Sequence, residues 1–472
     1  MNRRKFFRNG SLFTLGTAFI SPFQATAAPI TPDFIDKNTK AKNIILLVSD
    51  GMSTGTLNMA DLYLNRKTGL GSNWLQLYKD NRISRALMDT ASASSIVTDS
   101  AAASSSWGSG FRVKNGALNV GPDGQEHLPI WQKFKKSGKM AGCVTTVPIT
   151  HATPAGFCIN SKSRNSQEDI AEQYLDLQFD IMMGGGQKYF DAESRKDKKD
   201  MYAAFKAKGY QVAKTRSEMM QASVDKPVLG VFSEDALPYA IDRNSDDKLK
   251  NSTPSLAEMA QKAIDRMKNH PNGFVLQVEA GKVDWAAHAN DIGGLLYDQI
   301  AFDEAIKVAI DFAEKDKNTL VIITTDHGNA NPGVIYGKNA NDNFDSIQKY
   351  THTNEWLLNN IHATSSLSQI KEVVDFANGS HLSDEDAKTV LSYYDGLHKE
   401  EGGLYNYRKL PYQAFAEMQK KSNSVGWISM DHSADYVELA MFGPGSQNLK
   451  PFIKNTDLHY LMLQAAEVEN KF

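Results

Sequence analysis

The sequence predicts an α/β fold with a central, mostly parallel β-sheet and helices on both faces, in a three-layer α/β/α arrangement. The first observation behind this prediction is a set of four short apolar runs, at residues 43–48, 140–146, 273–279 and 320–326. Runs that stay apolar throughout are typical of strands that are buried on both faces of a parallel sheet. The second observation is that segments with helical patterning separate these runs. Parallel strands need such crossover helices, so both observations predict the same architecture.

The clearest of these helical segments are residues 255–269 and 292–315. A third observation places a site on the predicted sheet, because three of the four apolar runs lead into a carboxylate: Asp50, Glu279 or Asp326. Ligands of open α/β sheets bind at the carboxyl ends of the strands. We therefore expect these three side chains to converge.

The composition is that of a large globular protein. The chain has 472 residues, of which 41% are hydrophobic, and a formal charge of -3. It can therefore bury a large core, and its acidic balance argues against a nucleic-acid partner. The cysteines are Cys143 and Cys158, too few for a framework of several disulfides. They can form one bridge or remain two buried thiols, and the sequence leaves both alternatives open.

The first 28 residues have the pattern of an export signal. An apolar run at residues 11–23 and small residues at 25–28 follow four basic residues, Arg3, Arg4, Lys5 and Arg8. This order predicts a removable signal, and the paired arginines favour the twin-arginine route over the general secretory route. Removing four positive charges and no negative ones takes the formal charge from -3 to -7. We expect an extracytoplasmic protein, periplasmic or secreted, whose mature chain has no membrane span.

Residues 335–425 differ in character from the rest of the chain. They are polar, with acidic and lysine-rich helical stretches at 383–394 and 412–421. We interpret them as an inserted subdomain of helices and loops within a single domain formed by residues 29–472. The pattern indicates a solvated cap and predicts no function for it.

A run of small residues, TDSAAAS at 98–104, places Ser100 where a helix can begin. Asp99 or Ser100 can cap such a helix. The unpaired backbone N–H groups at a helix start also attract an anion such as phosphate. The run alone is typical of a plain helix cap, so a nucleophilic role for Ser100 depends on the residues around it.

Acidic and histidine residues stand at spacings that suit metal binding. Asp284 and His288 are four residues apart, so they share one face of a helix, and carboxylate and imidazole are both zinc ligands. A hydrogen-bonded pair is the alternative for these two residues alone. Further candidate ligands lie at or near the ends of apolar runs: Asp50, Glu279, Asp326, His327 and His432. Together these residues indicate a metal centre at the edge of the sheet.

The chain resembles the alkaline phosphatase family in six stretches, which occur in the order typical of that family. These are LLVSDGM at 46–52, VTDSAAA at 97–103, THATPA at 150–155, DIMMGGG at 180–186, QVEAG at 277–281 and TDHG at 325–328. The resemblance implies an alkaline phosphatase-like catalytic domain. It also implies two zinc ions and one magnesium ion per chain as cofactors.

The resemblance further implies a role for each matching residue. Ser100 is the nucleophile that becomes phosphoserine, and Arg164 is the clamp on the phosphate, since a guanidinium binds phosphate oxygens bidentately. The ligands implied for the first zinc are Asp284, His288 and His432. Those implied for the second are Asp50, Asp326, His327 and Ser100. The magnesium ligands are Asp50, Thr153 and Glu279, an all-oxygen set that suits a hard cation.

Two positions depart from part of the family. His151 stands where some members have aspartate, and Trp285 stands where others have lysine or histidine. We expect both, together with Asp99, to lie near the magnesium site or the phosphate. The departures put magnesium occupancy and phosphate release in question.

The sequence thus predicts a broad-specificity phosphate monoester hydrolase, with small phosphate monoesters as substrates and inorganic phosphate as product. A sulfatase is disfavoured because neither cysteine lies in a Cys-x-Pro-x-Arg setting. A phosphodiesterase with similar metal ligands and a binder without catalysis are the remaining alternatives. The sequence leaves open whether the chain forms a homodimer.

Overall fold

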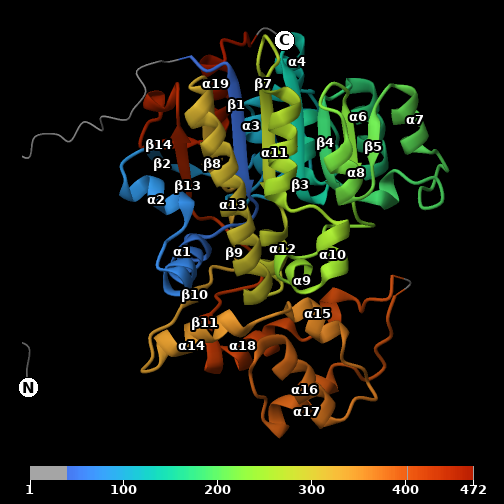
Figure 1. Ribbon diagram of the computed structural model, residues 1–472, viewed down its shortest axis with the longest axis vertical. Helices are drawn as coiled ribbons and strands as arrows, with labels where there is room; N and C mark the ends of the chain where they lie inside the picture. Colours follow the sequence, from blue (N-terminus) through green and yellow to red (C-terminus); the bar gives the residue numbers. More distant parts are fainter. Residues whose placement is uncertain (1–39, 401, 471–472) are drawn as a thin grey trace, which may run out of the picture. The chain divides into compact units, whose positions relative to one another are not determined.

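The computed structural model describes residues 40–400 and 402–470, so the predicted export signal lies outside the described residues. Its centre is a ten-stranded sheet with the order β14-β2-β13-β8-β1-β7-β3-β4-β6-β5 (Figure 1). The strands of this sheet are β1 (Asn43–Ser49), β2 (Ser84–Asp89), β3 (Met140–Pro148), β4 (Ile181–Gly185), β5 (Gln211–Ala213), β6 (Val228–Val231), β7 (Phe274–Ala280), β8 (Thr319–Thr324), β13 (Val437–Phe442) and β14 (Phe452–Lys454).

Most neighbouring strands of the sheet are parallel, as the sequence predicts. The exception is β13, which runs antiparallel to both β2 and β8. The strand β1 pairs with β7 on one side and with β8 on the other, and all of its residues are buried. This burial on both faces explains why the run at 43–48 is apolar throughout.

Helices cover both faces of the sheet. Alternate residues of a strand point to opposite faces of the sheet. On one face, Ile45 and Leu47 of β1 pack in an apolar cluster with helices α1, α11 and α13. On the other face, Ile44 and Leu46 pack in a second cluster with helices α3, α4, α5 and α19. In Figure 1, α11 and α13 lie in front of the sheet. The helices are α1 (Thr54–Thr68), α2 (Asn73–Lys79), α3 (Ser100–Ser109), α4 (Ile130–Lys136), α5 (Ala152–Cys158), α6 (Gln167–Leu177), α7 (Met201–Ala207), α8 (Arg216–Gln221), α9 (Ala240–Ser245), α10 (Asp247–Ser252), α11 (Leu256–Met267), α12 (Lys282–His288), α13 (Ile292–Asp316), α14 (Ala340–Ser346), α15 (Asn354–Asn359), α16 (Leu367–Asn378), α17 (Asp384–Ser392), α18 (Tyr412–Asn423) and α19 (Asn455–Ala465).

The helix α11 shows how the sequence specifies these elements. Ser255 and Glu258 form a capping box at its start, in which each side chain accepts a hydrogen bond from the backbone N–H of the other residue. Its buried residues Met259, Ala263 and Met267 follow one another at intervals of four and so share one face. The predicted segment at 255–269 therefore becomes a helix that packs on the sheet.

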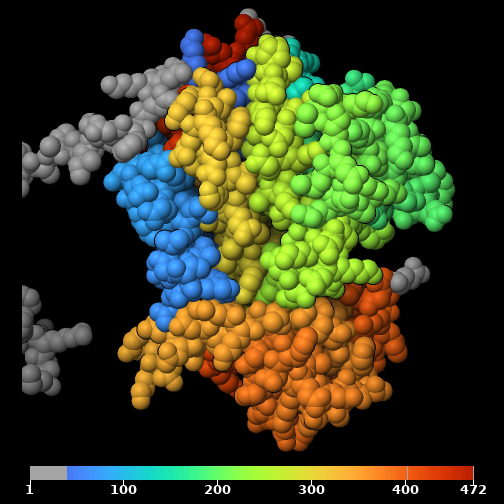
Figure 2. Space-filling model, viewed as in Figure 1, coloured from blue at the N-terminus to red at the C-terminus, as the bar shows by residue number. Residues whose placement is uncertain are grey.

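Helices α14–α18 lie between two short strands, β10 (Gly333–Val334) and β11 (Val425–Gly426), which pair with each other. Several of these helices enclose an apolar cluster of their own, which includes Leu358, Val374 and Phe415. A link to the sheet domain runs through Asp242 of α9, which accepts hydrogen bonds from the backbone N–H of Thr353 at 2.9 Å and from its hydroxyl at 2.7 Å. Figure 2 shows the orange surface of these helices directly against the yellow-green surface around α9.

Two further features bear on the predictions. Cys143 and Cys158 are buried free thiols whose sulfur atoms lie 3.6 Å apart. No helix in the part of the chain that the structure describes has both the length and the apolarity that crossing a bilayer requires.

Candidate active site

The predicted nucleophile begins a helix at the carboxyl edge of the sheet. Asp99 is the N-cap of α3, and its Oδ1 accepts a hydrogen bond from the backbone N–H of Ala102 at 3.0 Å. Ser100 follows as the first helical residue and is buried. Its Oγ lies 3.4 Å from Oδ1 of Asp50 and 3.3 Å from Nε2 of His327.

The carboxylates expected at the strand ends do converge. Strand β1 lies between β7 and β8, and Val48 is paired with both Glu279 and Thr324. Asp50 and Asp326 each follow their strand by one or two residues, so they reach the same edge as Glu279. With Asp284 of α12, four buried carboxylates gather there.

Asp284, His288 and His432 form a group with ligand atoms within 4.8 Å of one another. Nδ1 of His288 lies 2.6 Å from the carbonyl oxygen of Met430, and Nδ1 of His432 lies 2.9 Å from that of Thr98. A carbonyl oxygen only accepts, so Nδ1 of each ring carries a proton. Nε2 of each ring lies 3.5 Å from a carboxylate oxygen of Asp284. Burial lowers the pKa of His432, but the hydrogen bond and the charge of Asp284 outweigh it and raise this pKa to about 9. The two Nε2 atoms face each other at 3.1 Å. These are the residues that the resemblance assigns to the first zinc.

A second group surrounds Ser100. Asp50, Asp284 and His327 form a set with the same spacing. Asp326 Oδ2 lies 3.2 Å from Nε2 of His327 and is buried without a hydrogen-bond partner. The structure thus brings together Asp50, Asp326, His327 and Ser100, the residues assigned to the second zinc, and Asp284 lies between the two groups.

The third group contains the residues assigned to magnesium. The Thr153 hydroxyl donates to Asp50 Oδ2 at 3.3 Å, and the Thr145 hydroxyl donates to Glu279 Oε2 at 2.5 Å. Glu279 Oε1 is buried without a partner. His151 lies close enough to Asp50 and Glu279 to form a metal-type group with them. His151 and Thr145 thus surround the expected oxygen ligands, and Thr145 is a residue that the sequence did not predict.

The buried carboxylates at this edge of the sheet favour the binding of cations. Burial, followed by the charges of Asp326 and Asp284, raises the pKa of Asp50 well above its usual range. Burial also raises the pKa of Glu279 to about 7. Buried carboxylates are paired or coordinate metals, because an uncompensated buried charge is unfavourable. The unpartnered oxygens of Glu279 and Asp326 and the Nε2 atoms that face Asp284 fit bound metal ions, because a cation there would take the place of the protons.

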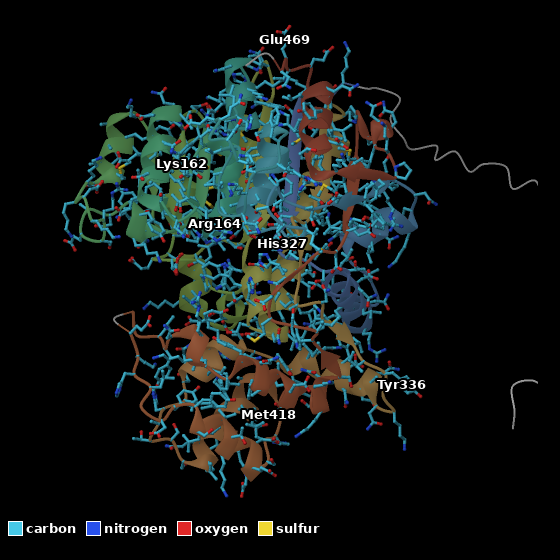
Figure 3. All side chains as sticks on the ribbon, turned by 180° about the vertical axis from the view of Figure 1, so that it is seen from behind. Lys162, Arg164, His327, Tyr336, Met418 and Glu469 are labelled. Atoms are coloured by element: carbon cyan, nitrogen blue, oxygen red, sulfur yellow. The ribbon has the colours of Figure 1, made fainter. Side chains whose placement is uncertain are left out.

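A cavity of about 610 Å³ opens beside these groups. Ser100, Asp284, His288 and His432 line it, together with Arg164, His151 and Trp285. Figure 3 labels Arg164 and His327 near the middle of the molecule, at the edge of the sheet. The remaining lining residues are Tyr239, Ala289, Glu355 and Tyr407.

The predicted phosphate clamp is held by its neighbours. Nη1 of Arg164 lies 3.0 Å from Oδ2 of Asp99, and Nη2 lies 3.1 Å from Nε2 of His151. Burial, followed by the positive charge of Arg164, lowers the pKa of His151 to about 3, so this imidazole is neutral and accepts the hydrogen bond. The ring of His151 meets that of Trp285 edge to face at 6.1 Å. Lys162, also labelled in Figure 3, is exposed and is not among the residues that line the cavity.

Sequence reasoning missed several residues of the site. Asn329 donates to Asp284 Oδ1 at 2.7 Å and so positions that carboxylate. Tyr239, Glu355 and Tyr407 line the cavity but carry no motif, and two of them come from the segment interpreted as a solvated cap. For Asn329, the neighbouring TDHG stretch was the one available signal.

Comparisons with known proteins show which family the chain belongs to. The alkaline phosphatase family profile matches residues 41–468. The chain is 31% identical to alkaline phosphatase 4 of Bacillus subtilis (strain 168) over 424 residues, which cover 88% of this chain and 87% of that protein. It is 30% identical to the alkaline phosphatase of Escherichia coli (strain K12) over 366 residues, which cover 67% of this chain and 78% of that protein.

A solved structure extends the likeness to the whole fold. The crystal structure of Thermus thermophilus alkaline phosphatase matches with a TM-score of 0.83 and 33% sequence identity, over 91% of this chain and 92% of that one. The resemblance drawn from six short stretches is thus confirmed by matches across most of the chain. The chain belongs to the alkaline phosphatase family of metal-dependent hydrolases that act on phosphate monoesters.

Proposed function

We propose that this chain is a broad-specificity phosphate monoester hydrolase that transfers the phosphoryl group first to Ser100 and then to water, releasing inorganic phosphate. The observation that carries this proposal is the position of the Ser100 hydroxyl. It lies at the start of α3, within 3.4 Å of Asp50 and His327, in the wall of a cavity that Arg164 also lines. A nucleophile and an anion-binding group therefore face the same space.

We propose two zinc ions and one magnesium ion as cofactors. The first zinc would be held by Asp284, His288 and His432. The second zinc would be held by Asp50, Asp326, His327 and Ser100. The magnesium would be held by Asp50, Thr153 and Glu279. When bound, such metals stabilise the attacking and leaving oxygens of an in-line displacement.

The residues of the chain then perform the two steps. Ser100 Oγ forms a bond to phosphorus as the bond between phosphorus and the ester oxygen breaks, and the alcohol leaves. The Ser100 hydroxyl donates to Asp50 Oδ1, which orients Oγ, and the proton that Ser100 loses is taken up by the departing ester oxygen. Water then attacks the phosphoserine from the vacated side, the Oγ–P bond breaks, and one proton of the water returns to Ser100 Oγ. The guanidinium of Arg164 holds the other phosphoryl oxygens, and Asp99 keeps that guanidinium in place.

The experiment that tests this proposal compares two serines of one helix. Ser100→Ala should lower the turnover of a monoester by several orders of magnitude, because it removes the nucleophile. Ser106→Ala is the matched control, since Ser106 lies in α3 and its hydroxyl donates to the carbonyl of Ala102. Acid-quenched protein should carry phosphate on Ser100, and its absence there would contradict the covalent route.

We further propose an extracytoplasmic location, periplasmic or secreted, reached through an export signal in residues 1–28. The paired arginines of the sequence and the family membership support this location. A homodimer stays a proposal that sedimentation of the purified protein can test.

A further inference from the structure

Four residues of the cavity wall are assigned neither to the metals nor to the phosphate clamp. These are Tyr239, Trp285, Glu355 and Tyr407, and we call them the leaving-group end. They come from different parts of the chain. Tyr239 precedes α9, Trp285 lies in α12, Glu355 lies in α15, and Tyr407 lies in the short 3-10 helix Tyr407–Lys409.

The carboxylate of Glu355 is available to a ligand. The backbone of this residue is held, because its N–H donates to Asp291 Oδ2 at 3.2 Å and its carbonyl accepts from Asn359 Nδ2 at 2.9 Å. Within residues 40–400 and 402–470, no hydrogen bond or ion pair uses its side-chain oxygens. A half-buried carboxylate in a cavity wall is thus left without a protein partner.

The rings at this end already stabilise a cation within the protein. The Nζ of Lys282 lies 3.5 Å from the centre of the Tyr239 ring and 5.0 Å from that of Trp285. Lys282 is buried, at 4% exposure, and is not among the residues that line the cavity. Ammonium groups at such distances are attracted by the negative face of an aromatic ring. Tyr407, which is about half exposed, adds a third ring to the cavity wall.

Acidic residues that do not line the cavity interact with Lys282. Asp242 and Asp298 each interact electrostatically with Lys282, and Asp298 is buried. Asp291 is also buried and, with Asp242, accepts hydrogen bonds from the backbone that leads into α15. Burial raises the pKa of Asp242 to about 6 and that of Asp298 to about 7, so the two carboxylates compensate the charge of Lys282 above about pH 7. Of these acids, Glu355 is the one that lines the cavity.

We propose that the leaving-group end is a subsite for a positively charged alcohol, so that the preferred substrates are phosphate monoesters of amino alcohols. An ammonium or quaternary ammonium group would lie against the rings of Trp285 and Tyr407 and pair with Glu355. A neutral alcohol can contact the rings but leaves the carboxylate unpaired, and an acidic alcohol is repelled by it. This inference rests on the proposed phosphomonoesterase activity and names its substrate class.

Two esters of equal shape test the proposal on the metal-loaded full chain. Choline phosphate and 3,3-dimethylbutyl phosphate differ only in a charged nitrogen replaced by carbon. The value of kcat/KM should be about tenfold or more higher for choline phosphate, consistent with a cation–π contact plus an ion pair. Equal values for the two esters would overturn the subsite while leaving the phosphatase proposal intact. Hydrolysis of neither ester would overturn both.

Variants then assign the preference to residues. Glu355→Gln and Tyr407→Leu should each reduce the ratio of the two kcat/KM values, with Glu355→Gln bringing it near one. Glu372→Gln is the matched control, because Glu372 lies in the next helix, α16, and lines a different surface pocket. This control should keep the ratio of the unaltered protein. A ratio that survives in both Glu355→Gln and Tyr407→Leu would overturn the assignment.

Discussion

Replacement of Arg164 by alanine tests the proposed phosphate clamp most directly. Its guanidinium is oriented by Asp99 on one side and His151 on the other, at 3.0 and 3.1 Å, and lines the cavity beside Ser100. Arg164 forms no bond to phosphorus in the proposed steps. Arg164→Ala should therefore retain measurable turnover and lose mainly affinity for substrate and phosphate.

The magnitude follows from the kind of contact that is lost. A hydrogen bond to a charged group contributes about 1.5–3 kcal/mol, and the Arg164 side chain is 22% exposed, so partial screening favours the lower part of this range. These energies correspond to roughly a 10- to 150-fold weaker affinity. Inhibition by inorganic phosphate, measured at constant metal concentration, reports this change directly.

The control for this experiment is Lys162→Ala, since Lys162 is a nearby basic residue that is exposed and lies outside the cavity wall. It should leave the inhibition constant of phosphate unchanged. If Arg164→Ala binds phosphate as tightly as the unaltered protein, Arg164 is not the clamp. If Lys162→Ala is then the weakened variant, the clamp must be reassigned to Lys162.

Three further predictions follow from the proposed metal groups, the export signal and the buried acids. His432→Ala should lower the zinc content by one ion per chain and remove most activity, whereas Glu279→Gln should lower the magnesium content instead. Elemental analysis of the two variants distinguishes these losses. Unchanged metal content in both variants would refute the ligand assignment. Joint replacement of Arg3 and Arg4 by lysine should retain precursor inside the cell, and undiminished export would point to the general secretory route. Burial raises the pKa of Asp298 to about 7. The folded chain therefore keeps a proton that the unfolded chain releases above about pH 4. Because of this difference, Asp298 lowers the free energy of unfolding as the pH rises from about 4 to 7. Asp298→Asn should reduce the difference in unfolding free energy between pH 5 and 8, measured by urea denaturation, and the same difference in both proteins would contradict this reasoning.

The central part of the fold could be predicted from sequence because its strands are buried on both faces. The runs at 43–48 and 273–279 coincide closely with β1 and β7, and the segment at 292–315 matches α13 within one residue at its end. Short edge strands such as β5 and β14 were not predicted, because three residues carry too little periodicity. The two-residue strands β10 and β11 exist only because tertiary structure brings them together.

The site divides in the same way. Asp50 and Glu279 could be predicted because each stands at the end of an apolar strand, and Ser100 because Asp99 marks a helix start. Tyr239 and Glu355 could not, because nothing in their own stretches of sequence distinguishes them from surface residues. They reach the cavity only through the packing of α9 and α15 against the sheet domain.

The antiparallel direction of β13 allows the chain segment between β8 and β13, and with it the substrate specificity, to vary. Strand β8 leaves the sheet at the catalytic edge after Thr324, and β13 re-enters at that edge, with Leu439 opposite Thr324. The segment at 325–436 connects these two strands and therefore begins and ends beside the reacting groups. It contains Asp326, His432 and Glu355. Closing a loop between fixed ends becomes costlier only slowly with its length, by about 0.6 kcal/mol per doubling. Insertions or deletions in this connecting segment can thus change the cavity wall while strands β8 and β13 keep their register.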